Sequence, residues 1–498
     1  NAGQSVTTGT LNTLVGGLAG DAITTADESV AIGYLALSAN TTADDNTAIG
    51  SHALTANTTG RINTAVGKGS MAANTTGQDN SAFGGLTLDA NTTGTGNTAL
   101  GYASLTSNTT ADNNTAVGYL AGAGVTTATY STIVGGLAGD AITTGSNNTI
   151  MGGKAGSGLT TGSNNVAFGY NALNADDVGS KSTAIGAQAL LTQNYSTATD
   201  SHNTAVGYHA GLYLTTGISN TIVGGRAGDA LTDADFNVAI GMDALTTDTK
   251  GNKSTALGVG ALGTQNFSTS TDSFNTALGF QAGTSATTAV QNTLIGGLAG
   301  DSITTGSWNA IVGYNAGGAL TTGANNTALG VAALASATTA TGNVAIGTEA
   351  GDAITTGGNN TVVGLVAGTA ITTGAGNTFV GANAGDGTDD GANNTAVGYL
   401  ALNANCGDAN TAVGEQALAR STGNTSTAVG KHAGEYNTSG SNNLFLGNDT
   451  GISGSPGGQI TTASNAIFLG DENISAANIQ VDWTVASDQR DKTDFTAL

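Results

Sequence analysis

The sequence repeats itself with a period of seventeen from one end to the other. A phrase close to Asn-Thr-Ala-Val-Gly recurs 27 times, and 21 of the 26 spacings between its glycines equal seventeen. Two spacings equal twenty-one, two equal sixteen and the last equals twenty-three. The first four of these glycines are Gly16, Gly33, Gly50 and Gly67. Such a unit is too short for a helical repeat, which needs about 33 residues or more.

We number each unit from this glycine as position 0. Position −4 is Asn in 21 units, as in Asn46 and Asn63, and positions −2 and −1 are apolar in all 27. Short apolar runs punctuated by Gly and Asn indicate strands and tight turns. The glycine itself marks a backbone with positive φ or a close approach. The sequence therefore predicts an all-β fold, a parallel β-solenoid of about 27 coils that forms a shaft over residues 1–447.

Stacked coils place like residues on like residues, so the Asn side chains are expected to form hydrogen-bonded ladders. Position +4 is either Gly or a large apolar residue, and position +7 compensates for it. The pairs include Leu54 with Asn57 and Gly20 with Ile23, whereas Gly385 with Thr388 and Gly434 with Asn437 do not follow the rule. We infer that one large side chain per coil fills one core slot.

Positions −2 and +1 also covary. Tyr at +1 usually follows Ala at −2, as in Tyr34, whereas Gly at +1, as in Gly17, usually follows Leu or Ile. Tyr314 after Ile311 and Gly85 after Ala82 break this rule. This exchange of side-chain volume favours packing of the +1 side chains against their neighbours. The alternative is that the +1 rings form a stripe that stacks on sugars.

Adjacent strand residues point to opposite faces, so only one of the columns −1 and −2 can fill the coil's own interior. We assign −1 to that interior, with Val66 as the example, and expect Val66→Asp to be strongly destabilising. The −2 and +1 columns then face a partner, and a long apolar stripe predicts a parallel, in-register homotrimer.

The two spacings of twenty-one carry near-copies around Tyr195 and Phe267. Two interpretations stay open: exposed loops that present an aromatic ring to a host glycan or receptor, or a duplicated block whose loop merely bulges. Beyond Gly447 the pattern loosens, and bulkier residues in 448–486, with an alternating strand at 479–485, predict a cap that closes the solenoid.

The net charge and the lack of known motifs disfavour several classes of function. The net charge of −23 disfavours nucleic acid and anionic membranes, which need clustered Lys and Arg. No apolar run approaches the length of a transmembrane helix, roughly 18 residues or more, so membrane insertion is not expected. No metal, cofactor or catalytic motif is present. The acidic pairs at 44–45, 176–177 and 389–390 are expected to be solvated turn residues rather than glycosidase carboxylates or cation ligands.

The C-terminal residues resemble a known junction. The stretch Val481-Asp-Trp-Thr-Val-Ala-Ser487-Asp488-Gln-Arg490-Asp-Lys492 is similar to the start of the intramolecular chaperone of phage tail fibres, with wording closest to cyanophage fibres. The resemblance implies a chaperone-like segment at 487–498, three chains, and one self-cleavage at the Ala486–Ser487 bond with Ser487 as nucleophile. The repeat also resembles the β-roll head of trimeric autotransporter adhesins.

These observations lead to one expectation and two alternatives. We expect a non-enzymatic fibre, the shaft of a phage tail fibre or other virion appendage, which binds host receptors and other virion tail proteins. The first alternative is an adhesin on a bacterial cell surface. The second is a carbohydrate-degrading β-solenoid, which needs converging carboxylates that the repeat does not supply. The repeat starts within a coil, so we expect the chain to be a piece of a longer polypeptide.

Overall fold

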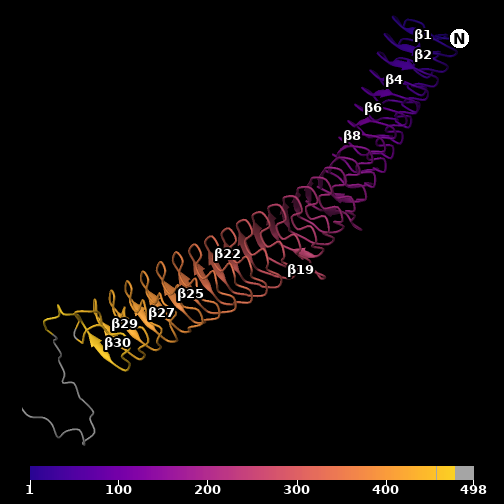
Figure 1. The fold of residues 1–498 in the computed structure, drawn as a ribbon. Coiled ribbons are helices and arrows are strands. Elements are labelled where there is room, and N and C mark those ends of the chain that lie inside the picture. Colours follow the sequence, from indigo (N-terminus) through magenta and orange to yellow (C-terminus); the bar gives the residue numbers. More distant parts are fainter. Residues whose placement is uncertain (456, 477–498) are drawn as a thin grey trace, which may run out of the picture. The chain divides into compact units, whose positions relative to one another are not determined.

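The computed structural model describes residues 1–455 and 457–476, and these residues form strands and turns without any helix. They fall into two compact units, residues 1–360 and the described residues from 361 to 476. Within each unit, parallel strands recur once per coil and lie side by side (Figure 1). The predicted parallel β-solenoid, with one coil for each unit of about seventeen, is therefore confirmed. The cap strand predicted at 479–485 lies outside the described residues.

Each coil contributes one three-residue strand to a parallel sheet. In the first unit these strands are β1 (Thr13–Val15), β2 (Val30–Ile32), β3 (Thr47–Ile49), β4 (Thr64–Val66), β5 (Ser81–Phe83), β6 (Thr98–Leu100), β7 (Thr115–Val117), β8 (Thr132–Val134), β9 (Thr149–Met151), β10 (Val166–Phe168), β12 (Thr183–Ile185), β14 (Thr204–Val206), β15 (Thr221–Val223), β16 (Val238–Ile240), β18 (Thr255–Leu257), β20 (Thr276–Leu278), β21 (Thr293–Ile295), β22 (Ala310–Val312), β23 (Thr327–Leu329) and β24 (Val344–Ile346). In the second unit they are β25 (Thr361–Val363), β26 (Thr378–Val380), β27 (Thr395–Val397), β28 (Thr411–Val413), β29 (Thr427–Val429), β30 (Leu444–Leu446) and β31 (Ile467–Leu469).

The strands pair in register, so each column of the repeat becomes a row along the sheet. Between β3 and β4, for example, Ala48 lies opposite Ala65 and Ile49 lies opposite Val66. The strand residues at −3, −2 and −1 are the only part of most coils in regular β-structure, and turns complete the rest of each coil. Like residues therefore stack on like residues, as the repeat predicts.

The Asn column forms the predicted ladder inside the coil. Asn63 is fully buried, its side-chain oxygen accepts a hydrogen bond from the backbone N–H of Asn80 at 3.1 Å, and its Nδ2 donates to the carbonyl of Gly77 at 2.9 Å. The side chain of Asn80 repeats both bonds, to Asn97 and to Gly94. These Asn side chains thus satisfy a buried donor of the next coil and a buried acceptor of the adjoining turn, which the strands themselves leave unpaired. Asn394 is an exception, because its buried Nδ2 has no hydrogen-bond partner among the described residues.

The interior is lined by the −2 column and not by the −1 column. Ala48 and Ala65 are fully buried, whereas Val66 is half-buried and many other −1 side chains are exposed, from 36% for Ile32 to 56% for Val15. The assignment of Val66 to the coil's own core is therefore wrong. The −2 column accepts Ala in most coils and larger side chains such as Ile150 and Phe379 in others, and all of these are fully buried, so strand alternation and not size places −1 on the outer face.

The shared core slot is confirmed, and the structure adds a third contributor to it. A Cβ built at Gly20 would lie 2.8 Å from Ile23 at +7 and equally close to Leu14 at −2. A large −2 side chain therefore also requires Gly at +4. This explains both departures from the rule, because a side chain at Gly385 would collide with the ring of Phe379 in its own coil, and one at Gly434 would collide with the ring of Phe445 at −2 of the following coil.

The volume trade between −2 and +1 does not come from direct packing of the two columns, but the +1 rings do pack against +1 residues of neighbouring coils. Tyr34 and its equivalents are about half exposed, and they lie outside the coil whereas −2 lies inside. The ring of Tyr34 approaches Gly17 of the preceding coil, whose Cβ would be 3.4 Å from it. The expected placement of the −2 column near a trimer axis is wrong for the same reason, since −2 residues are enclosed by their own coil.

The glycine at position 0 has a backbone that other residues rarely adopt. Gly33 has a φ of +136°, and a Cβ there would lie 2.6 Å from the carbonyl oxygen of Gly50. We expect Gly33→Ala to lower the free energy of unfolding by about 3 kcal/mol, through strain and the backbone clash. Gly136→Ala is the control, since its Cβ meets nothing within 4 Å. Thermal unfolding followed by circular dichroism measures both, and equal melting temperatures for the two variants would contradict this reading of position 0.

Candidate functional site: two wide coils and a surface groove

Two coils of the first unit are four residues longer than their neighbours. Each adds a two-stranded parallel sheet, β11 (Gly179–Ser180) with β13 (Thr199–Asp200) and β17 (Gly251–Asn252) with β19 (Thr271–Asp272). An exposed ion pair of 2.6 Å lies beside each sheet: Lys181 pairs with Asp200, and Lys253 pairs with Asp272. The extra length is therefore used for a small second sheet and not for a free loop.

The expectation that Tyr195 and Phe267 are exposed aromatics for receptor contact is wrong. Both rings are only 6% exposed. The Tyr195 hydroxyl donates to the carbonyl of Gly217 at 2.7 Å and accepts from the side chain of Asn203 at 3.1 Å. Burial raises the pKa of the Tyr195 phenol. The additional residues widen the coil, and the aromatic ring fills the added interior, which favours the interpretation of a duplicated structural block.

A buried polar network lies beneath each ring. Asp176 takes the +7 slot that holds Asn in many coils, and it accepts hydrogen bonds from the backbone of Gly179 at 3.0 Å and from Gln193 at 2.7 Å. Gln193 also donates to Ser182 at 2.7 Å. In the second copy, Asp248 accepts from the equivalent Gln at 2.6 Å. These carboxylates are enclosed and satisfied, which suits a structural role. The expectation that Asp176 is a solvated turn residue is therefore wrong, because the widened coil encloses its side chain.

The stability of this network is expected to depend on pH. Burial raises the pKa of Asp176 above the ordinary value of 3.8. The folded state then binds this proton more tightly than the unfolded state, so the contribution to stability is full below 3.8 and is lost as pH rises through the folded pKa. Relative to Asp176→Asn, the wild type is expected to lose stability between pH 3 and pH 7. Urea unfolding at both values tests this, and parallel losses in the two proteins would contradict it.

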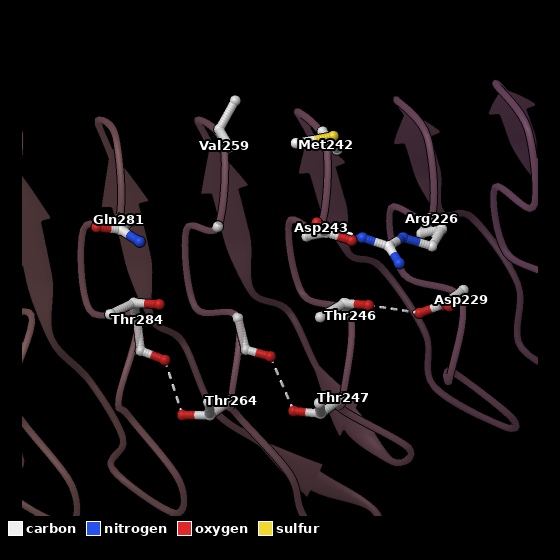
Figure 2. A pocket seen from close by; sticks show the side chains of 12 residues that line it. Arg226, Asp229, Met242, Asp243, Thr246, Thr247, Val259, Thr264, Gln281 and Thr284 are labelled. Carbon is white, nitrogen blue, oxygen red and sulfur yellow. Dashed lines mark hydrogen bonds and ion pairs between the residues drawn. The ribbon is translucent and has the colours of Figure 1, made fainter.

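A groove of about 600 Å³ lies on the outside of the first unit, across four coils. It exists because coil 15, the coil of Gly258, has Gly260 at +2 and Gly263 at +5, and this is the only coil in the repeat with Gly at both places. Figure 2 shows the result: Asp243 and Thr246 stand on one side, Gln281 and Thr284 on the other, and no side chain rises between them.

The two sides of the groove carry planar polar groups. The Arg226 guanidinium forms an ion pair with Asp243 at 2.8 Å, and Thr246 donates to Asp229 at 2.6 Å (Figure 2). The exposed side chains of Met242 and Val259 line the same groove. The sequence analysis missed this site, although the paired glycines of coil 15 were a visible signal for it.

The other sequence candidates do not converge. Asp44 and Asp45 form exposed ion pairs with Arg61, at 2.8 Å and 3.5 Å, so one acidic pair is engaged on the surface. Among the described residues no group of three or more His, Cys, Asp or Glu side chains is placed to hold a metal ion. Ser487 and the Ala486–Ser487 bond lie outside the described residues, so self-cleavage there stays a prediction.

The comparisons with known proteins do not assign the chain to a family. No protein-family model matches it, and no curated protein matches it significantly. In the part of the chain that the structure describes, no helix is long and apolar enough to cross a membrane.

Proposed function

We propose that the chain is a structural and adhesive fibre whose rods associate through the outer face of the parallel sheet. This face, which we call the strand face, consists of the side chains at −3 and −1. None of its 54 positions is charged, and every −1 residue is apolar. Large −1 side chains such as Phe83, Leu100 and Phe168 are between 41% and 51% exposed in the single chain. Monomeric proteins rarely leave an apolar surface of this extent uncovered.

The absence of charge on the strand face is the observation that carries the proposal. The chain has 45 charged residues at neutral pH, 11 basic and 34 acidic, and a net charge of −23, so chance alone would place several on the face. The acidic residues occur instead in the turns, as at Asp27, Asp44 and Asp112. Strongly negative rods repel one another, and an uncharged face is where they can approach at low electrostatic cost.

A second copy of the same chain is the partner that fits this face best. The strand face repeats once per coil throughout each unit, so a partner that covers it needs the same spacing. Parallel copies in register meet that condition, and a closed ring of copies buries the face on each of them. The two resemblances favour three copies. The homotrimer is thus kept as a proposal, with the −3 and −1 columns toward the axis in place of −2.

We further propose that the fibre serves host attachment, as the shaft of a phage tail fibre or other virion appendage, and that it catalyses no turnover. Its partners would be a host glycan or receptor and other virion tail proteins. The alternative is a bacterial surface adhesin. Immunogold electron microscopy with antibodies against residues 1–360 tests the choice in the source culture. Label on appendages of virus particles supports the proposal, and label confined to bacterial envelopes contradicts it.

A further inference from the structure

We propose that the groove at coil 15 binds a neutral saccharide. The inference rests on the proposed attachment function and gives it a site, which the repeat itself does not contain. The volume of about 600 Å³ falls within the range of small-molecule sites, and the groove is open along the surface. An open groove of this kind admits a residue within a longer glycan chain as well as a chain end.

The polar groups in the groove match what sugar hydroxyls need. A hydroxyl both donates and accepts hydrogen bonds, and carboxylate, amide and guanidinium groups offer complementary pairs of acceptors and donors. Asp243 uses one oxygen for Arg226, whose guanidinium keeps further N–H donors. The side-chain amide of Gln281 forms no hydrogen bond with any group of the described residues, so its oxygen and its N–H groups are available to a ligand.

The apolar side chains and the net charge of the groove restrict the chemical class of the ligand further. Met242 and Val259 are 53% and 40% exposed at +1, and they offer a surface for the C–H face of a sugar ring. Phe280 continues the same +1 column in the next coil, and its ring is exposed. The groove contains two carboxylates and one guanidinium, so its net charge is negative, as is that of the whole chain. An anionic saccharide is therefore disfavoured.

The groove can be filled by a substitution at Gly263. Gly263 has no positive φ, and a Cβ there would lie 3.4 Å from the Thr284 hydroxyl, inside the groove, and 3.1 Å from the Gly260 carbonyl oxygen, a tight contact that requires a small local shift. The equivalent +5 position of the preceding coil carries Thr246, so the repeat tolerates threonine at this place. Ala72→Thr introduces threonine at +5 of a distant coil and is the control.

Saturation-transfer NMR on the full chain tests the site, with maltose, lactose and cellobiose as neutral probes and sialyllactose as the anionic comparison. We expect transfer to the ring protons of at least one neutral disaccharide, at least a tenfold weaker affinity in Gly263→Thr, and no change in Ala72→Thr. The proposal is overturned by no transfer to any neutral probe, by a preference for sialyllactose, or by equal binding in the two variants. None of these results alters the molecular mass of the assembly, so failure of the site is distinguishable from failure of the fibre.

Discussion

Replacing Ala65 with aspartate is expected to lower the free energy of unfolding by several kcal/mol, on the order of 4. Ala65 is fully buried and lies opposite Ala48 and Ala82 in the neighbouring strands. A carboxylate at this place has no partner and no room within the narrow coil. Because each coil rests only on its neighbours, the damage should spread to adjacent coils of the same unit. Thermal unfolding followed by circular dichroism measures the loss.

Val66→Asp is the matched comparison, one residue further along the same strand. Its side chain lies on the strand face, so the coil should keep its β-structure while association of the rods is weakened. A melting temperature for Ala65→Asp equal to that of the wild type would contradict the inward placement of −2. A loss of β-structure in Val66→Asp as large as that in Ala65→Asp would mean that the −1 side chains belong to the core after all.

Asn80→Ala is expected to cost about 2 kcal/mol, because it leaves one buried backbone N–H unpaired and removes one of two hydrogen bonds to a buried carbonyl. The Asn80 side chain accepts from the backbone N–H of Asn97 at 2.9 Å and donates to the carbonyl of Gly94 at 2.9 Å. The Gly94 carbonyl keeps its second bond, from the Asn91 side chain at 3.0 Å, whereas the Asn97 N–H loses its partner. Chemical denaturation monitored by far-ultraviolet circular dichroism measures the cost.

Asn80→Ser supplies the control, because serine occupies −4 in five coils. Ser29 and Ser131 accept the backbone N–H of the next coil at 3.3 Å and 3.2 Å, so serine keeps one of the two bonds. Its cost should be near half that of alanine. Equal costs for both variants would mean that the ladder contributes through volume and not through hydrogen bonds.

The period, the strands and the Asn ladder could be predicted because each depends on a residue type that recurs at a fixed place. The direction of the strand side chains could not. Columns −1 and −2 are both apolar, so hydrophobic alternation does not distinguish inside from outside. Side-chain size suggested that Val and Ile fill the core. The opposite holds because strand alternation places only one of the two columns inside, and the interior accepts both Ala65 and a larger residue such as Ile150 at −2.

The turns and the groove show a second limit. Leu35 and Leu37 adopt a φ of 57°, a left-handed conformation that leucine seldom takes and that no local pattern announces. Stacking against the neighbouring coils holds this turn in place, and it outweighs the intrinsic preference of leucine for a negative φ. The groove likewise depends on a difference between one coil and the next, and a consensus repeat does not show such a difference. The buried rings of Tyr195 and Phe267 were misplaced because insertions usually leave the fold outward.

The mass of the intact chain in solution, measured by multi-angle light scattering at neutral pH and moderate salt, tests the central claim most directly. Burial of the strand face between copies predicts a uniform species with three times the mass of one chain, and Val66→Asp should shift it toward smaller species. A stable, soluble monomer with its strand face open to water would contradict the account.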